Sequence, residues 1–592
     1  MAASNPHPRR ATKLWRRLIG NDQLVLFVLA AVVGVAAAYG AIGFRIAIDA
    51  IQTLFYGARS EEVIATAQAL AWWHRLLAPA LGGLGIGLFV HFVMPARRNL
   101  GVAEVIEAGV LKGGRMRLRD GFTAAAASAA SIGVGASVGR EGPVVHLVAT
   151  MGSWLAQRLR LGRSMTLTLL GCAVASGVAA SFNAPIAGVF FALEVVVGHY
   201  GLSAFAPVVI AGVLGTIVVR IHLGDFPAFV VPGAEITSFT ELPAFLLLGG
   251  VCAVMAILLM AGITLVATVA ERTRLPGYLV PAGGGLLVGA VAVFFPEVIG
   301  VGYETTDRAL GGGLGLWVLL LLLAAKTAAS CLSLGSGFGG GIFSPALCIG
   351  ALTGAAFGTI AVALAPALGA NVSAYSIVGM GAVAGAVLGA PISTILIIFE
   401  LTGDYTLTLA VMAAGAVSSL IVRQTVGNSF FTLQLARRGV DLAGGHERAV
   451  CQAIPASQLV SDRYRTVEAA MPVEEIRELL RRIPDTELYV VDAAGRLVGL
   501  LAFNDIKEAV FGPDMDPALR AGDLASLATT LIAQGETLDR ALELFETTDS
   551  QYLPVVETLD SAKLVGVIRH RDALMAYNQA LSDLNRERGG AR

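Results

Sequence analysis

Two short glycine-flanked segments carry the most suggestive chemistry in this sequence. They read G-R-E-G-P at 139–143 and G-I-F-S-P at 341–345, and each lies inside a long apolar region. The first places a carboxylate, Glu141, where a chain surrounded by lipid should carry no charge. Apolar segments interrupted by Gly and Pro at matching places of two repeats indicate an ion or substrate site. The pair therefore predicts a protein that moves a small ion across a membrane.

The residue types in these segments suit an anion. Glycines allow consecutive backbone N–H groups to turn toward a bound ion, and Pro143 and Pro345 favour a helix that begins just before them. Two helix N-termini, each carrying about half a positive charge, would hold a desolvated anion without a buried Lys or Arg. We expect Glu141 to occupy the site as a tethered competitor and to leave when protonated, as a gate or a proton carrier. The alternative is a buried structural carboxylate.

His146 follows Glu141 by five residues, on what should be the same helix. A buried histidine usually satisfies a hydrogen bond of the core. The sharper hypothesis is that His146 modulates Glu141 with pH, near the unperturbed histidine value of about 6.5.

An internal repeat supports the pairing of the two segments. F-N-A-P-I-A-G-V-F-F-A-L-E at 182–194 matches L-G-A-P-I-S-T-I-L-I-I-F-E at 388–400, at an offset of 206 residues (388 − 182). The glycine-flanked segments have nearly the same offset, 202 residues (341 − 139). Two markers at such similar offsets predict a duplication, and chance similarity of apolar sequence is the alternative. The sequence leaves open whether the repeats are inverted in the membrane.

Composition and charge support a membrane protein. Of 592 residues, 55% are hydrophobic and 14% are charged, whereas a soluble domain typically has about 25% charged residues. The stretch Leu24–Gly43 has the length of a spanning helix and exceeds a signal-peptide core. Other clear apolar runs lie at 76–94, 144–158, 165–180, 203–219, 244–269, 315–334, 346–367 and 405–422, whereas 122–138 and 185–197 are too short or too Gly-rich for simple spans. The five cysteines form no C-x-x-C pair, so we expect small core residues and no metal site.

The chain changes character near residue 440, where a charged tail of soluble type begins. The tail contains two copies of a helix–strand–turn–strand–helix unit. The predicted organisation is a cytoplasmic N-terminal segment 1–21, a transmembrane domain 22–440 with repeats at about 22–225 and 240–440, a linker 441–455, and a regulatory tail 456–592 with halves at about 456–514 and 520–580.

These motifs give the chain a family resemblance. Over nearly its whole length it resembles the CLC chloride channels and H⁺/Cl⁻ antiporters. The two glycine-flanked segments stand where the two anion-site loops of that family stand, F-N-A-P-I-A-G at 182–188 looks like a third signature, and G-V-A-E-V at 101–105 resembles the first. The tail resembles a tandem CBS pair, which many CLC proteins carry.

The resemblance implies a fold and an anion site. The fold is an α-helical polytopic membrane protein of two inverted repeats with broken helices, followed by a soluble α/β tandem CBS domain. The family forms homodimers with a separate pore in each subunit. Arg140, Glu141 and Gly142 would sit at the outer anion site, with Glu141 as the gating glutamate, and the amides of Ile342 and Phe343 would sit at the central site.

Two departures from the family pattern affect the central site. Leu100 stands where the pore serine of the family stands, and Phe431 stands where many members have a tyrosine. Two hydroxyl donors are thus replaced by apolar groups. Their loss could cost roughly 1–3 kcal/mol each in site affinity, so backbone amides would carry more of the coordination.

A third departure concerns protons. Antiporters of the family usually have an inner glutamate directly after the position of Glu194, and here that residue is Val195. The proton-relay position therefore lacks a carboxylate, which favours passive conduction, although some coupled members manage without it. Glu194 and its repeat mate Glu400 suggest a shared structural role, in helix capping or at the dimer face.

The CBS-like tail has two candidate ligand residues, Asp505 and Asp572, each at a predicted helix start. CBS pairs that bind adenine nucleotides often have a Ser or Thr three residues earlier, and here those positions are Ala502 and Arg569. We therefore expect a dimer-stabilising platform in which the aspartates cap helices. Binding of an adenine nucleotide is the alternative.

The sequence as a whole predicts a chloride channel gated by protonation of Glu141, in the cell membrane, with the N-terminus and the CBS pair cytoplasmic. The alternative is a proton-coupled chloride or fluoride antiporter of the same fold. A more distant alternative is a membrane sensor that acts through its CBS pair. No nucleophile–base or metal-ligand spacing suggests an enzyme. We expect small anions and the lipid bilayer as partners, no nucleic acid, and no required cofactor.

Overall fold

The computed structural model divides the chain between residues 443 and 444 into two compact units. Each unit is described by itself. The residues described are 22–59, 62–225, 229, 241–364, 371–427, 429–440, 451–452, 454–482, 487–512, 516–526, 530–548 and 550–589. The predicted segment 1–21 and most of the predicted linker lie outside these residues.

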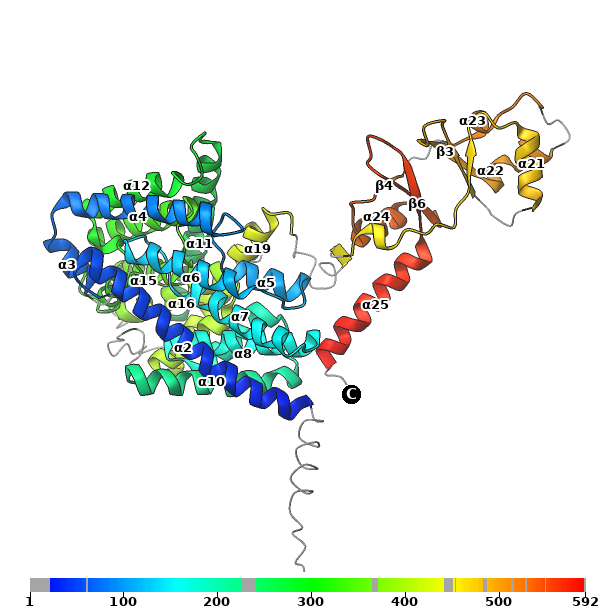
Figure 1. The fold of residues 1–592 in the computed structure, drawn as a ribbon. Helices are drawn as coiled ribbons and strands as arrows, with labels where there is room; N and C mark the ends of the chain where they lie inside the picture. Colours follow the sequence, from blue (N-terminus) through cyan, green and yellow to red (C-terminus); the bar gives the residue numbers. More distant parts are fainter. Residues whose placement is uncertain are drawn as a thin grey trace, which may run out of the picture. The chain divides into compact units, whose positions relative to one another are not determined.

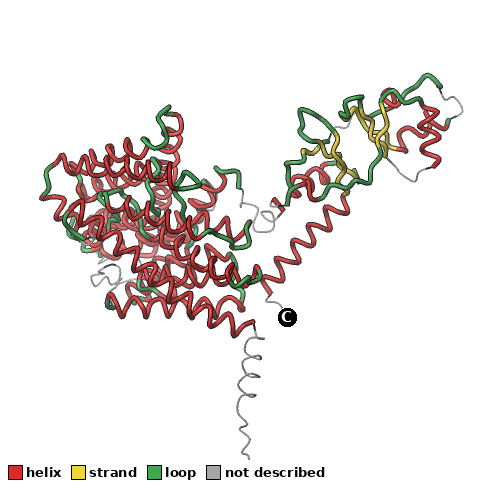
Figure 2. The backbone as a smooth tube through the Cα atoms, viewed as in Figure 1, coloured by secondary structure: helices red, strands yellow, loops and turns green. Residues whose placement is uncertain are grey.

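Helices joined by loops make up the described part of the first unit (Figures 1 and 2). In chain order they are α2 (Asp22–Tyr56), α3 (Val63–Ala69), α4 (Trp72–Val93), α5 (Val102–Leu111), α6 (Leu118–Gly133), α7 (Glu141–Arg158), α8 (Arg163–Phe182), α9 (Pro185–Phe191), the π-helix η1 (Ala192–Val197), α10 (Leu202–Leu223), α11 (Leu242–Arg272), α12 (Val280–Phe294), the 3₁₀ turn η3 (Pro296–Val298), α13 (Tyr303–Leu310), α14 (Leu316–Gly335), α15 (Phe343–Leu364), α16 (Val372–Leu388), α17 (Pro391–Thr402), α18 (Tyr405–Thr425) and α19 (Phe430–Ala436).

Eight helical segments of the described chain are long and apolar enough to cross a membrane, which confirms the predicted multi-pass architecture. Shorter apolar helices lie between them, including Pro185–Val197 and Val372–Leu388. Large apolar side chains such as Leu54, Phe92 and Trp317 are exposed on the outside of the unit, as expected for a protein that faces lipid.

The core of this unit is packed closely through glycine. All of α16 from Ser373 to Leu388 is buried. A Cβ atom on Gly350 of α15 would lie only 2.4 Å from the carbonyl oxygen of Gly379 of α16. The two backbones therefore approach at a distance that no larger residue allows.

The repeat predicted from the sequence is visible in the backbone. Asn183 and Gly389, 206 residues apart, both end a helix in the left-handed conformation, with φ of 56° and 65°. Each is followed by an extended alanine, with φ of −128° at Ala184 and −129° at Ala390, and then by a proline at the start of a short helix. Matching conformations at matching positions confirm the duplication.

The second unit contains two three-stranded sheets of the same topology. In the first, β1 (Thr466–Glu468) is parallel to β2 (Glu487–Val491), which is antiparallel to β3 (Leu497–Ala502). In the second, β4 (Ile532–Ala533), β5 (Tyr552–Val556) and β6 (Leu564–Arg569) repeat this order. The helices are α21 (Val473–Arg482), α22 (Phe503–Phe511), α23 (Ala521–Leu524), α24 (Leu538–Thr547) and α25 (His570–Gly589), after a 3₁₀ turn η5 (Ala456–Gln458). Each sheet has its own apolar core.

Candidate functional site

The two glycine-flanked segments meet at one point of the first unit. Gly139 and Gly341 pair as an antiparallel bridge, and each backbone N–H donates to the carbonyl oxygen of the other at 2.7 Å. Helix α7 begins at Glu141 and helix α15 begins at Phe343, directly after the bridge. Because residues at equivalent places of the two repeats pair reciprocally, the repeats are related here by a local two-fold axis.

Glycine is required where the segments cross. A Cβ atom on Gly341 would lie 2.8 Å from the backbone nitrogen of Gly142, and a Cβ on Gly142 would lie 3.0 Å from the Cα of Gly341. Two helix N-termini can therefore be brought together only because neither segment has a side chain in the contact.

Buried serines of the two repeats support this crossing. The backbone N–H of Ser137 donates to the Ser333 hydroxyl at 3.0 Å, and the hydroxyls of Ser137 and Ser330 lie 3.1 Å apart. On the other side, the N–H of Gly339 donates to the Ser131 hydroxyl at 2.9 Å. These bonds tie the loop before each helix start to a helix of the other repeat.

The Glu141 carboxylate is buried, with 1% of the residue exposed, and has two hydroxyl donors. Tyr303 donates to Oε1 at 2.7 Å and Ser344 donates to Oε2 at 2.5 Å. Arg140 Nε lies 3.8 Å from Oε1, and the Arg140 guanidinium lies 4.6 Å from the centre of the Tyr303 ring. These contacts hold the Glu141 side chain at the start of α7.

Tyr303 is itself held through a buried cation. Lys326 of α14, with 1% of the residue exposed, donates to the carbonyl oxygens of Val298 at 3.1 Å and Gly300 at 3.0 Å. These carbonyls belong to the turn that leads into α13, whose first residue is Tyr303. Lys326 therefore fixes the turn that presents the Tyr303 hydroxyl to Glu141.

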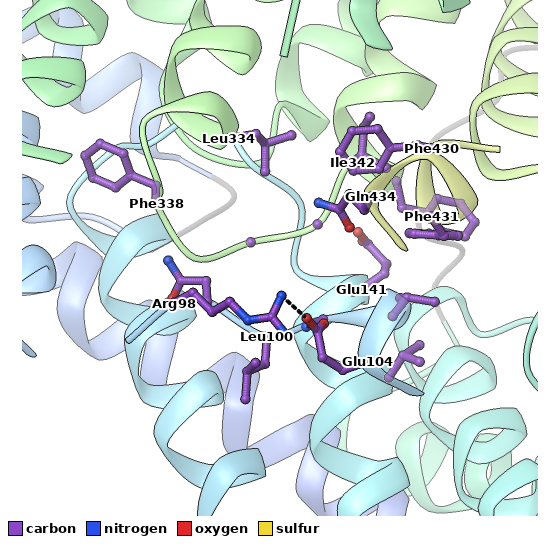
Figure 3. Close-up of a pocket in the computed structure, with 18 of the residues that line it drawn as sticks. Arg98, Leu100, Glu104, Glu141, Leu334, Phe338, Ile342, Phe430, Phe431 and Gln434 are labelled. Carbon is purple, nitrogen blue, oxygen red and sulfur yellow. Dashed lines mark hydrogen bonds and ion pairs between the residues drawn. The ribbon is translucent and has the colours of Figure 1, made fainter. Parts of the chain in front are cut away.

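A cavity of about 360 Å³ adjoins Glu141 (Figure 3). Its lining brings together six of the predicted site residues, which are Leu100, Glu141, Gly142, Ile342, Phe343 and Phe431. Among the described residues that line it, Arg140 is not included, so a direct role of Arg140 in anion binding stays a prediction. The side chains of Leu100 and Phe431 present only apolar groups to the cavity.

Polar side chains at the other end of this cavity were not predicted. Arg98 lies 3.4 Å from Glu104, and Arg438 makes a closer contact with the same carboxylate. Glu104 also accepts from the backbone N–H of Gly101 at 2.6 Å, which caps α5. Figure 3 shows the Arg98–Glu104 pair. The motif G-V-A-E contained Glu104, but nothing in the motif pointed to the distant Arg438 as its partner.

Val195 lies half-buried in η1 and is not among the described residues that line the cavity. Its predicted relevance to proton relay therefore stays a prediction. Its neighbour Glu194 accepts from the backbone N–H groups of Ile392 at 3.2 Å and Ser393 at 2.9 Å, at the start of α17. The predicted capping role of Glu194 is confirmed.

His146 lies on α7, as predicted, with 2% of the residue exposed. Its Nδ1 atom has no hydrogen-bond partner among the described residues. It lines a second cavity of about 340 Å³ together with Glu104, Asp120 and Thr150, and this cavity shares Arg98, Leu100 and Glu104 with the first. No described residue supplies the expected core hydrogen bond to Nδ1, and modulation of Glu141 stays a prediction.

Sequence reasoning missed the two hydroxyls that hold Glu141. Ser344 stood inside the second motif, so a search for donors in that segment could have found it. Tyr303 lies 162 residues from Glu141 in a segment without a motif. Only the fold brings it to the site.

The candidate ligand residues of the tail are placed less completely. Asp572 lies in the first turn of α25, directly after β6 ends at Arg569. Asp505 lies in α22, but its side chain is outside the described residues. The expected platform with capping aspartates stays a prediction, and adenine-nucleotide binding stays its alternative.

Comparison with known proteins agrees with this architecture. The family model described as voltage gated chloride channel matches residues 82–423, and the CBS domain model matches 456–512 and 526–579. A putative chloride channel protein, ClcB-like, of Ralstonia nicotianae is 35% identical over 421 residues, which cover 70% of this chain and 98% of that protein.

Two further similarities extend the comparison. The H⁺/Cl⁻ exchange transporter ClcA of Vibrio cholerae is 33% identical over 319 residues, or 52% of this chain and 67% of that protein. A eukaryotic CLC transporter of known structure superimposes with a TM-score of 0.60 at 19% identity, over 92% of this chain and 97% of that chain. The structural similarity concerns the fold alone.

Proposed function

We propose a gated anion pathway for this chain, which belongs to the voltage-gated chloride channel (CLC) family of membrane anion transporters. The single observation that carries the proposal is the position of Glu141. Its buried carboxylate lies beside the cavity between the starts of α7 and α15. A negatively charged side chain there occupies the place that suits a permeating anion.

Protonation opens this pathway. The neutral carboxyl group no longer benefits from the charge-assisted bonds of Tyr303 and Ser344, and it no longer repels an anion. The side chain leaves, and an anion takes its place against the backbone N–H groups of Ile342 and Phe343. Acidification on the side from which Glu141 is reached therefore raises anion flux.

Passive conduction of chloride is the first form of this function. The apolar Val195 supports passive conduction, because this chain has no carboxylate at the position where antiporters of the family usually have the inner proton-relay glutamate. Proton-coupled exchange is the second form, and the buried, unpartnered Nδ1 of His146 favours it. The cavity beside His146 shares Arg98, Leu100 and Glu104 with the anion cavity, so a proton could approach by that side.

The assembly and orientation follow the family pattern. The protein is a homodimer with one pathway per subunit, in the cell membrane, with its N-terminus and CBS pair in the cytoplasm. Ile186 of α9 and Ile392 of α17, at matching places of the repeats, are 45% and 43% exposed. Both side chains lie at the surface, where the proposed subunit contact can use them.

The test is paired recording of chloride and protons from purified protein in liposomes under an imposed chloride gradient. Chloride efflux without proton uptake beyond a leak supports the channel. Proton uptake in a fixed ratio to chloride, driven against its own gradient, establishes exchange. A Glu141→Gln variant, which mimics the protonated state, should pass chloride without responding to pH. Strong pH dependence in that variant would place the gate elsewhere.

A further inference from the structure

The cavity beside Glu141 lacks two hydroxyl donors. By the family resemblance, a serine and a tyrosine would face the anion at the positions that Leu100 and Phe431 occupy. Leu100 and Phe431 both line the cavity with apolar groups. A desolvated anion gains most from several donors at once, and each missing hydrogen bond to a charged species is costly. Another side chain of the cavity can supply a donor only if it is near and not otherwise bonded.

Gln434 meets both conditions. It lies on α19, three residues after Phe431, so the two side chains are on the same face of the helix, one turn apart. It lines the same cavity as Glu141 and Ile342, and it is half-buried. Figure 3 shows its side-chain amide reaching from α19 toward the side of the cavity where Ile342 and Glu141 lie.

The amide of Gln434 makes no hydrogen bond within the part of the chain that the structure describes. The helix that carries it is nevertheless well anchored. Ser429 and Thr432 form a reciprocal capping box, and Leu435 is fully buried. The backbone of α19 is thus fixed while the side-chain amide is free to turn, and an amide always has two N–H donors to offer.

The other polar side chains of the cavity are engaged. Arg98 and Arg438 pair with Glu104. Asn99 donates to the carbonyl oxygen of Gly337 at 2.5 Å. The carboxylate of Glu141 accepts from its two hydroxyls. Among the described polar residues of this lining, Gln434 is the one whose side chain makes no hydrogen bond or ion pair.

We propose that the Gln434 side-chain amide donates a hydrogen bond to a small monovalent anion in this cavity, in place of the donors absent at Leu100 and Phe431. This inference rests on the proposed anion pathway. A neutral amide adds a donor without a fixed positive charge, so it strengthens binding while the anion is still able to leave. Gln434 is therefore a specificity-determining residue for anions.

Chloride titration calorimetry on the purified full-length protein tests this role. Gln434→Met keeps the length of the side chain and removes the donor, and it should weaken chloride binding about tenfold, the order expected for one hydrogen bond to a charged partner. Gln434→Glu keeps the shape and adds a negative charge, and it should weaken binding further. Phe431→Tyr in the Gln434→Met background should restore much of the affinity, because it returns a hydroxyl to the same face of α19.

A matched control is Gln424→Met on α18, where the glutamine is exposed and outside the cavity. This control should leave chloride affinity unchanged. Melting temperature and gel-filtration profile establish that each variant is folded, and the isosteric Gln434→Glu keeps the test decisive if the Met variant unfolds. Equal chloride affinity in the wild type and both Gln434 variants would overturn the inference. If the wild type neither binds nor transports chloride, the proposed function itself fails.

Discussion

Glu194 and Glu400 form reciprocal helix caps between the two repeats. Glu194, which follows α9, caps the start of α17, and Glu400, on α17, caps the start of α9. Glu194 accepts from Ile392 and Ser393 at the start of α17. Glu400 accepts from Ile186 at 2.9 Å and from Ala187 at 2.7 Å at the start of α9. All three pairs of equivalent residues are 206 positions apart. A carboxylate at a helix N-terminus satisfies otherwise unpaired N–H groups and interacts favourably with the helix dipole.

These exchanged caps predict symmetric losses of stability. Glu194→Ala and Glu400→Ala should each lower stability by about 1–2 kcal/mol, the upper range for a lost cap, because the N–H groups are partly buried. Thermal unfolding in detergent measures this loss. The control is Glu271→Ala on α11. Glu271 is exposed and pairs with Arg437 near the surface, so its loss should change stability by less than about 1 kcal/mol. Losses no larger than the control would contradict the capping role.

The hydrogen bond from the Tyr303 hydroxyl to Glu141 predicts a change in chloride flux when it is removed. Tyr303→Phe keeps the ring beneath Arg140 and removes the bond to Glu141 Oε1. Because that bond holds the Glu141 side chain in the pathway, its loss should let the side chain leave more readily. Chloride flux at neutral pH should rise several-fold, up to about tenfold for a lost bond of roughly 1.4 kcal/mol.

The Glu141→Gln background supplies the control for Tyr303. There the carboxylate is already absent, so adding Tyr303→Phe should have little further effect on flux. An equal effect of Tyr303→Phe in both backgrounds would mean that it acts through the structure of α13 and not through Glu141. Liposome flux between pH 4.5 and 8 distinguishes the two results.

The local features of this site could be predicted because each depends on the residues of one short segment. The two Gly-rich motifs, the Ala-Pro helix starts and the terminal glutamates gave the repeats, the helix starts at Glu141 and Phe343, and the capping by Glu194. Each depends on neighbouring residues whose backbone preferences act locally. The two α/β halves of the tail were predictable for the same reason.

The features of the site that could not be predicted from the sequence are contacts between segments far apart in the chain. Tyr303 reaches Glu141 only because a turn bound by Lys326 places the first residue of α13 beside the first residue of α7. Arg438 reaches Glu104 across 334 residues of sequence. No sequence motif marks Gln434. Its proposed role as an anion donor depends on the hydrogen bonds and ion pairs that the other polar side chains of the cavity already make. Such relationships are set by packing, which a single sequence does not encode locally.

The close crossing of the two loops predicts intolerance of any side chain at Gly341. An alanine there would place its Cβ 2.8 Å from the backbone nitrogen of Gly142. The loops must separate, at a cost of about 1–3 kcal/mol, and chloride affinity should fall because the two helix starts move apart. Gly313→Ala, where a Cβ meets nothing within 4 Å, should leave both unchanged. Wild-type melting temperature and chloride affinity in Gly341→Ala would show that the crossing is more adaptable than this geometry implies.

The tail contains a partly buried glutamate, and we expect the stability of the tail to depend on pH because of it. Glu487, the first residue of β2, is half-buried, and burial raises the pKa of its carboxyl group above the ordinary value, while a hydrogen bond from Tyr489 at 3.3 Å partly offsets this rise. At pH below the ordinary value of about 4.3 the group is protonated whether the protein is folded or not. As pH rises through the folded-state pKa, the folded tail must bury a charge, so its stability falls.

Glu487→Gln should therefore stabilise the tail at neutral pH. The gain is expected to be less than about 1 kcal/mol because the carboxyl group is only partly removed from water, and it should shrink as the pH falls toward 4. Urea unfolding of the fragment 444–592 at several pH values measures this difference. Glu474→Gln, an exposed position on α21 with the same change of charge, should show no such trend. A Glu487→Gln gain that is constant with pH would show that packing, and not the burial of the charge, causes it.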